Sequence, residues 1–256
     1  MTDPHVYPAG WGIKPVLFHL GAVEVPSYSF FVLLGLVAGL TVYFREAKQQ
    51  KDLGERSFFI IAGSLIGGML GAKGLEWAIN YPEILDRGLA ADFLLNGKTI
   101  IGGLIGGMLG ANITKKLLGI KTKKGNLIAP GIALGVAVGR LGCFLHGCCY
   151  GKPTSLPWGV DFGDHVLRHP TQLYEGLFML GMFFYLERIK VRPGLKPGEL
   201  FKILMIAYFI FRFLIEFIRV EKAAFWGLTV FQVIALGVLA YLLKDNLRRT
   251  ETHGGK

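Results

Sequence analysis

The sequence predicts an all-α membrane protein, a bundle of seven transmembrane helices. Of its 256 residues, 52% are hydrophobic and 18% are charged, against about 25% charged in soluble domains. The apolar residues fall in runs close to the roughly 20 residues that a helix needs to cross a bilayer. The 36 glycines are about twice the usual share, and small residues let membrane helices pack closely. This composition excludes a disordered chain and argues against an ordinary water-soluble enzyme.

The apolar segments are expected to form one integral membrane domain over residues 1–256. The seven expected spans are residues 27–44, 58–79, 99–118, 126–147, 171–188, 199–219 and 226–243. Residues 1–26, with Trp11 and several prolines, are expected to lie as an arm along the outer interface. Lys14 is the only Lys or Arg in this arm and no small-residue cleavage site follows, so the first span is not a cleavable signal.

The alternate loops differ in basic charge. One set, which includes the C-terminus, carries 18 Lys and Arg residues, and the other set carries 7. Because cytoplasmic loops are enriched in Lys and Arg, we expect the N-terminus outside and the C-terminus in the cytoplasm. Contact with anionic headgroups accounts for the net charge of +10. No basic patch is interleaved with exposed aromatics, so no nucleic-acid role is expected.

The second and third spans share an internal repeat. Residues 65–72 and 104–111 both read LIGGMLGA. Glycines spaced four residues apart line a close helix contact, which is the simpler interpretation. An inverted-repeat transporter is the alternative, and eight residues do not decide between them.

The fourth span ends in the run GRLGCFLHGCCYGKPT, which contains Arg140, Cys143, His146, Cys148 and Cys149. Three cysteines within seven residues are compatible with three interpretations. They are a zinc or redox site, a disulfide on the oxidising outer side, and a lining of small apolar side chains. The spacing matches no zinc signature. We therefore expect no metal and no cofactor.

The fifth span begins with the run HPTQLYE, which contains His169, Gln172, Tyr174 and Glu175. Pro170 suits the first position of a helix, and a carboxylate near a helix N-terminus is stabilised by the helix dipole. Without further information, this run indicates a capped helix anchored at the membrane interface by its tyrosine.

The sixth span places Tyr208, Arg212, Glu216 and Arg219 on one helix face by their spacing of four, four and three. Ionisable residues at bilayer depth are costly and indicate function. A structural pair of Arg212 with Glu216 is the alternative. Two arginines against one glutamate leave a surplus positive charge, which favours an anionic ligand such as phosphate.

In this order the motifs resemble the prolipoprotein diacylglyceryl transferase family, integral enzymes of the bacterial inner membrane. The resemblance covers nearly the whole chain. It rests on Tyr28, Gly102-Gly103-Leu104, Ala129-Pro130, Gly139-Arg140, the HPTQLYE run, the Arg212, Phe213, Glu216 and Arg219 pattern, and Gln232 in the last span.

The resemblance implies a multi-pass inner-membrane enzyme, acting as a monomer without a cofactor. It would transfer the diacylglyceryl group of phosphatidylglycerol to the lipobox cysteine thiol of a prolipoprotein signal peptide, forming a thioether and releasing glycerol phosphate. We assign phosphate binding to Arg140 and Arg212, support of Arg212 to Glu216, and proton transfer to His169 or His146. The expected substrate-binding residues are Tyr28, Gly102, Gly103, Gly151, Gln172, Tyr174, Glu175, Tyr208 and Arg219.

The sequence also departs from the family pattern. Cys143, His146 and Cys148 stand where the family usually carries Asn, Asn and Glu, Ile101 stands in place of a family His, and Asn126 in place of an Asp. Three alternatives therefore stay open. They are a divergent transferase with another acceptor, a non-catalytic lipid-binding or transport protein, and a cysteine-based redox or metal protein of the membrane.

Overall fold

The computed structural model describes residues 13–21, 23–50, 54–81, 99–120 and 124–251, with side chains up to residue 244. The described chain is mostly helical, as the sequence predicts. It divides into two compact units. One comprises the described residues from 47 to 120, and the other comprises the described residues up to 46 and from 124 onward.

The first unit contains helices α2 (Glu55–Ile79) and α5 (Ile100–Leu117). The glycines of the repeat bring the two backbones together. A Cβ on Gly67 would lie 2.4 Å from the carbonyl oxygen of Gly106, and a Cβ on Gly71 would lie 2.3 Å from that of Gly102. The facing partners move in opposite directions along the chain, so the helices are antiparallel. This geometry supports close packing as the use of the repeat.

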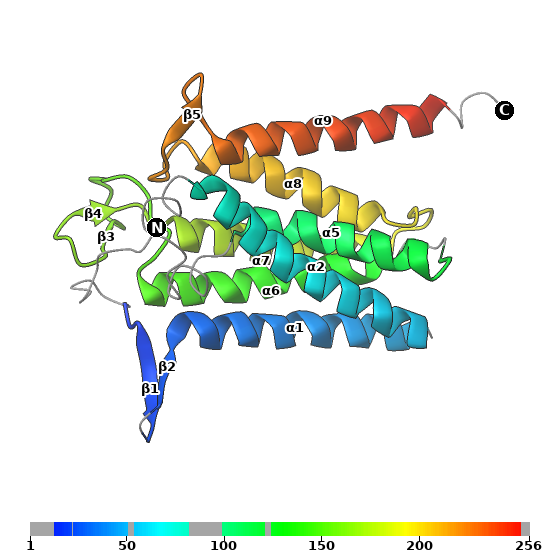
Figure 1. The fold of residues 1–256 in the computed structure, drawn as a ribbon, viewed down its shortest axis with the longest axis horizontal. Coiled ribbons are helices and arrows are strands. Elements are labelled where there is room, and N and C mark those ends of the chain that lie inside the picture. The colour runs from blue at the N-terminus through cyan, green and yellow to red at the C-terminus, as the bar shows by residue number, and fades with distance from the viewer. Residues whose placement is uncertain (1–12, 22, 51–53, 82–98, 121–123, 252–256) are drawn as a thin grey trace. The chain divides into compact units, whose positions relative to one another are not determined.

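The second unit contains five helices, which follow one another up and down the bundle (Figure 1). These helices are α1 (Ser27–Gln49), α6 (Gly125–His146), α7 (Thr171–Ile189), α8 (Glu199–Ile215) and α9 (Val230–Glu251). Glycines again allow close approach, because a Cβ on Gly35 would lie 2.4 Å from the carbonyl oxygen of Gly135. The helix α7 joins α8 through the stacked rings of Phe178 and Phe211, 4.3 Å apart.

Three short antiparallel hairpins lie at one end of these helices (Figure 1). They pair β1 (Val16–Leu20) with β2 (Val23–Pro26), β3 (Val160–Asp161) with β4 (Leu167–Arg168), and β5 (Ala223–Phe225) with β6 (Leu228–Thr229). At this end α1, α7 and α9 begin and α6 and α8 end. Part of the expected N-terminal arm is therefore a hairpin, while residues 1–12, including Trp11, lie outside the described residues.

The other end of this unit holds an ion-pair cluster formed by Arg45, Glu46, Glu187 and Lys190. Lys190 Nζ lies 2.7 Å from Glu46 and 2.9 Å from Glu187, and Arg45 lies 2.8 Å from Glu187. Burial lowers the pKa of Lys190, but its hydrogen bonds to the two carboxylates outweigh burial and raise it. The cluster joins the end of α1 to the end of α7.

Seven described helices match the seven predicted segments in order. Three of them, α1, α2 and α6, are long and apolar enough to cross a membrane, and α9 carries a shorter apolar stretch, Val230–Lys244. The helix α8 has 17 residues, about 26 Å at 1.5 Å per residue. This length falls just short of a hydrocarbon core of about 30 Å.

Two predicted spans extend four residues beyond the helices that the structure shows, whereas α1 continues five residues past the predicted end of its span. The sixth segment was expected to stay helical to Arg219, but α8 ends at Ile215, because the backbone after it bonds to another loop. The Lys152 amide donates to the Ile218 carbonyl at 2.7 Å, and Gly151 bridges Arg219. The last helix begins at Val230 rather than at residue 226, because Trp226 and Gly227 adopt positive φ in the turn of a hairpin.

Candidate active site

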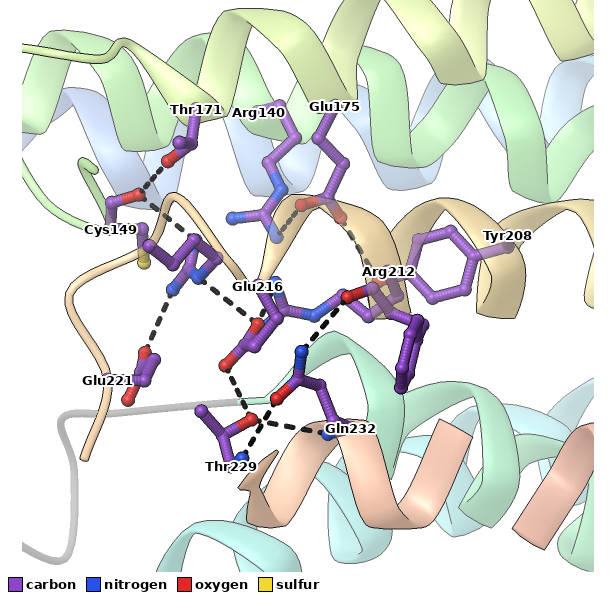
Figure 2. Close-up of polar contacts among 12 residues, drawn as sticks. Arg140, Cys149, Thr171, Glu175, Tyr208, Arg212, Glu216, Glu221, Thr229 and Gln232 are labelled. Carbon is purple, nitrogen blue, oxygen red and sulfur yellow. Dashed lines mark hydrogen bonds and ion pairs between the residues drawn. The ribbon is translucent and has the colours of Figure 1, made fainter. Parts of the chain in front are cut away.

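Three buried arginines meet two buried glutamates within the second unit. Arg140 comes from α6, Glu175 from α7, and Arg212 and Glu216 from the last turn and the cap of α8 (Figure 2). Arg219 follows three residues after Glu216. Each is at most 7% exposed. Charges at such depth are stable only when paired and hydrogen-bonded, so their contacts define what the cluster can do.

Glu175 is the centre of the first half of the cluster. One of its carboxylate oxygens pairs with the Arg140 guanidinium, and the other accepts a hydrogen bond of 3.0 Å from the Tyr208 hydroxyl (Figure 2). Arg140 Nε has no hydrogen-bond partner in the described chain. Arg140 therefore keeps a donor for a further acceptor, whereas Tyr208 is already bound to Glu175.

Glu216 is the centre of the second half. It pairs with Arg212 at 2.8 Å, lies 3.7 Å from Arg219 Nε, and accepts a hydrogen bond of 3.1 Å from the Thr229 hydroxyl. The Arg212 guanidinium also lies over the ring of Phe231, 5.0 Å from its centroid. The predicted pairing of Arg212 with Glu216 is present, and Glu216 also carries a link to the start of α9.

Arg219 faces the loop that follows α6. It donates to the carbonyl oxygen of Cys149 at 3.0 Å and to Glu221 at 3.1 Å. The same Cys149 carbonyl accepts a hydrogen bond of 2.6 Å from the Thr171 hydroxyl (Figure 2). Gln172 donates to the neighbouring Cys148 carbonyl, and its own side-chain oxygen is buried without a partner in the described chain. The loop after α6 is thus tied to the start of α7 and to the segment that follows α8.

The cysteines of this loop form a compact group. Cys143, Cys148 and Cys149 are free thiols, and their sulfur atoms all lie within 4.8 Å of one another. The pKa of Cys149 lies well below its ordinary value, because it accepts hydrogen bonds from the other two thiols and because Arg219 and Arg140 favour the thiolate. The pKa of Cys148 lies well above its ordinary value, because hydrogen bonds to its neighbours and burial favour the thiol.

The remaining predicted residues of this unit lie around the cluster. His169 and Tyr174 form a pair, with 3.3 Å between Nδ1 and the hydroxyl, and the Trp158 indole donates to the same hydroxyl at 2.8 Å. His146 is exposed and its ring lies 6.0 Å from that of Tyr28. These contacts leave the two histidines as separate candidates for proton transfer.

The predicted glycines fall in different places. A Cβ on Gly151 would lie 2.6 Å from the Ile218 carbonyl oxygen and 2.8 Å from the His169 Cβ, so this glycine lets the loop pack against the end of α8. Gly102 and Gly103 belong to the first unit. Gly102 packs against α2, whereas a Cβ on Gly103 would meet neighbours only at 3.7 Å or more.

Sequence reasoning missed how Thr171, Thr229 and the carbonyl groups of Cys148 and Cys149 hold the cluster together. Thr171 belongs to the HPTQLYE run, but its contact with the Cys149 carbonyl joins distant segments, and no local signal predicts it. Thr229 did carry one. Thr229 and Gln232 form a capping box at the start of α9, with 2.9 Å from the Thr229 amide to Gln232 Oε1 and 3.2 Å from the Gln232 amide to Thr229 Oγ1, and the pattern T-x-x-Q is typical of that motif.

Comparison with known proteins gives a consistent result. The family model described as prolipoprotein diacylglyceryl transferase matches residues 15–243. A phosphatidylglycerol–prolipoprotein diacylglyceryl transferase of Clostridium tetani is 34% identical over 81% of this chain and 86% of its own length. Proteins of the same name from Wolbachia pipientis wMel and Geobacter sulfurreducens are 31% and 32% identical, over 92% and 82% of this chain and 97% and 84% of their own lengths.

Proposed function

Because the chain belongs to the prolipoprotein diacylglyceryl transferase family, we propose that it transfers the diacylglyceryl group of phosphatidylglycerol to a prolipoprotein. The acceptor is the thiol of a lipobox cysteine in the signal peptide, and the products are a thioether and glycerol phosphate. The observation that carries this proposal is the buried cluster of Arg140, Arg212 and Arg219, in which Arg140 Nε has no partner in the described chain and can donate to a phosphate group.

The arginines act on the leaving group. As the bond between the glyceryl carbon and the phosphate oxygen breaks, negative charge develops on the phosphate, and preorganised cations lower the barrier. Arg140 and Arg212 bind this phosphate. Their own carboxylate partners, Glu175 and Glu216, hold the two guanidinium groups in place, so that little reorganisation is needed during the reaction.

The surrounding polar groups bind the rest of the substrates. Headgroup hydroxyls are bound by Tyr28, Tyr174 and Gln172, whose side-chain oxygen has no partner in the described chain. Tyr208 acts through Glu175. Arg219 lies nearer the exit at the loop of residues 147–153. His169 or His146 accepts the proton of the attacking thiol, because the thiolate is the nucleophile.

The chain works as a single multi-pass domain in the inner membrane of a bacterium, as a monomer. All seven helices cross the bilayer, with the N-terminus outside and the C-terminus in the cytoplasm. The family match extends over both compact units, which supports one functional domain. The 18 to 7 asymmetry of basic residues supports the orientation, and it puts the hairpin end of the second unit, with the arginine cluster, on the outer side.

This function is tested by mass spectrometry. A lipobox peptide is incubated with the purified protein and phosphatidylglycerol in nanodiscs, and its mass is then measured. We expect a mass gain of one diacylglyceryl group on the cysteine, and none when Arg140→Ala or Arg212→Ala is used. Arg45→Ala is the matched control, because Arg45 is also ion-paired but lies in the cluster at the other end of α1. No mass gain with the unaltered chain, while a relative such as the Clostridium tetani enzyme is active in parallel, would contradict the proposal.

A further inference from the structure

The three cysteines are grouped more tightly than their sequence spacing suggests. Cys143 lies in the last turn of α6, Gly147 ends that helix with φ +79°, and the chain then turns back, so that the Cys148 amide donates to the Cys143 carbonyl at 3.1 Å. Cys149 itself adopts φ +65°. This turn brings all three sulfur atoms within 4.8 Å of one another.

The frame that carries the sulfur atoms is held from outside. The Cys148 carbonyl accepts from Gln172, and the Cys149 carbonyl accepts from Thr171 and Arg219. Since these donors fix the backbone on both sides of the Cys148–Cys149 bond, the sulfur positions are set by the fold. A preorganised backbone of this kind is typical of a metal-ligand site and is not required of cysteines that serve only as packing residues.

The spacing and the charge of this group suit a thiophilic cation. A metal–sulfur bond of about 2.3 Å in a tetrahedral site separates the sulfur atoms by about 3.8 Å, which the observed limit of 4.8 Å accommodates. Three thiolates and one divalent cation leave one negative charge. Arg140 Nη1, 3.8 Å from Cys143 Sγ, and Arg219, bound to the Cys149 carbonyl, supply neighbouring positive charge.

In the part of the chain that the structure describes, the group offers three ligands and no fourth. Zinc sites with three protein ligands and one open position are typical of catalysis, whereas structural sites are closed with four. Two of the three cysteines, Cys143 and Cys148, stand where the family pattern has Asn and Glu, and Ile101 replaces a family histidine. A second means of activating the acceptor thiol would fit both observations.

We propose that Cys143, Cys148 and Cys149 bind one zinc ion, or a similar thiophilic divalent cation, and that its open position binds the acceptor thiol as a thiolate. This inference rests on the proposed transferase function. Metal coordination deprotonates a thiol, and the proton passes to the proposed histidine base and then to solvent. The site lies beside Arg140, so the bound sulfur and the phosphate-binding group share one locality.

The reaction then balances without an oxidant or a reductant. The sulfur donates an electron pair to the glyceryl carbon, the new carbon–sulfur bond forms, and the carbon–oxygen bond to phosphate breaks. Its electron pair leaves with glycerol phosphate, whose added negative charge faces Arg140 and Arg212. The product thioether is neutral and is a weaker ligand than a thiolate, so it leaves the metal and reopens the position.

Metal binding is tested first, on the purified full chain in detergent. We expect one zinc ion per chain by elemental analysis, and a cobalt-substituted protein with thiolate charge-transfer bands that change on adding a lipobox cysteine peptide but not its serine analogue. Cys143→Ser, Cys148→Ser and Cys149→Ser should each weaken zinc binding more than tenfold. His165→Ala, an exposed histidine of the same outer loop, is the control that keeps full stoichiometry. Elution volume and Tm identify any variant that fails to fold.

Lipidation is then measured before and after metal removal by a chelator. We expect the rate to fall roughly 100-fold at neutral pH, as expected for losing activation of the thiol, and to recover when zinc is added. Four results would each overturn the inference and leave the transferase function standing. They are the absence of bound metal, a metal stoichiometry that the cysteine changes do not affect, a disulfide among these cysteines in place of metal, and full activity without metal. If the three thiolates bind zinc but no peptide is lipidated, the proposed function is contradicted instead. The two outcomes can be told apart because zinc binding is measured without lipidation.

Discussion

Glu175 binds two other buried side chains at once. It is 1% exposed, pairs with Arg140 and accepts the Tyr208 hydroxyl. A buried arginine without its partner would keep the cost of desolvation and lose the compensating attraction. Glu175 therefore both stabilises the bundle and orients the arginine that we assign to the phosphate.

Glu175→Gln should cost both stability and activity. The change keeps the shape but leaves Arg140 unpaired, so we expect about 3 kcal/mol of destabilisation and a loss of lipidation. Glu187→Gln is the matched control, because this carboxylate is 22% exposed and lies in the ion-pair cluster at the other end of α7, where a pair contributes at most about 1 kcal/mol. Denaturant unfolding in micelles and peptide lipidation measure the two effects. Equal losses for both variants would contradict a special role of Glu175.

These contacts also show which parts of the site the sequence predicts. Arg212 and Glu216 are four residues apart on one helix, so helix geometry alone predicts their pairing. Arg140 and Glu175 are 35 positions apart, and no local pattern relates them. The sequence therefore identifies the members of the cluster, but it assigns Glu175 to substrate binding near a helix dipole, and the pairing with Arg140 becomes visible only in the folded chain.

The α2–α5 pair shows how a repeat of eight residues specifies a helix contact. Small residues on facing turns let two backbones come together, and in a membrane such packing replaces the hydrophobic effect as the force between helices. A side chain at these positions would strike the backbone carbonyls of the partner helix. At Gly67, Gly71, Gly106 and Gly110 the nearest atoms all belong to the partner's backbone, which cannot move aside as a side chain can.

Gly67→Ala should weaken this helix pair. The added Cβ would lie 2.4 Å from the Gly106 carbonyl oxygen and 2.9 Å from the Gly110 Cα, so we expect overpacking to cost about 1–3 kcal/mol. Gly74→Ala is the control on the same helix, because nothing lies within 4 Å of its Cβ. There the higher helix propensity of alanine is expected to be neutral or favourable. A comparison of Tm values in one detergent measures the difference, and equal values would contradict the contact.

The start of α9 depends on the capping box of Thr229 and Gln232. Thr229→Val keeps the volume but removes the hydroxyl that caps the helix and the hydrogen bond to Glu216. We expect a loss of about 1–2 kcal/mol and, because Glu216 supports Arg212, a lower lipidation rate. Thr41→Val serves as the control, since Thr41 only bonds back to Val37 on its own exposed turn. Unchanged lipidation in Thr229→Val would show that Glu216 does not need this support.

Helices and hairpins differed in how far the sequence predicted them. Runs of apolar residues identified all seven described helices, because a long hydrophobic segment has few other stable states in a bilayer. The hairpins have strands of two to five residues, too short to show alternation. At residues 225–231 the apolar run FWGLTVF continued across a turn, so hydropathy extended the last helix into β6.

The second unit as a whole has two chemically different ends. One end has the three hairpins and the arginine cluster (Figure 1, Figure 2), and the other has the cluster of Arg45, Glu46, Glu187 and Lys190. Between them, large apolar side chains such as Val37, Leu177 and Ile210 are 48–68% exposed. Such a band between polar ends is what a lipid-facing surface requires, and it fits the proposed crossing of the bilayer by every helix.

The orientation of the bundle in the membrane decides the side from which substrates reach the arginine cluster. Trp226 is fully exposed at the turn of the β5–β6 hairpin, on the end proposed to face outward. An alkaline phosphatase domain inserted after Trp226 should therefore be active, whereas the same domain fused at the C-terminus should be inactive and a green fluorescent protein there should be fluorescent. The positive-inside rule gives this sign, because the set of alternate loops that includes the C-terminus carries 18 basic residues and the other set carries 7. The opposite pair of results would place the cluster on the cytoplasmic side, and phosphatase activity at both sites would mean that the helix between them, α9, does not cross the bilayer.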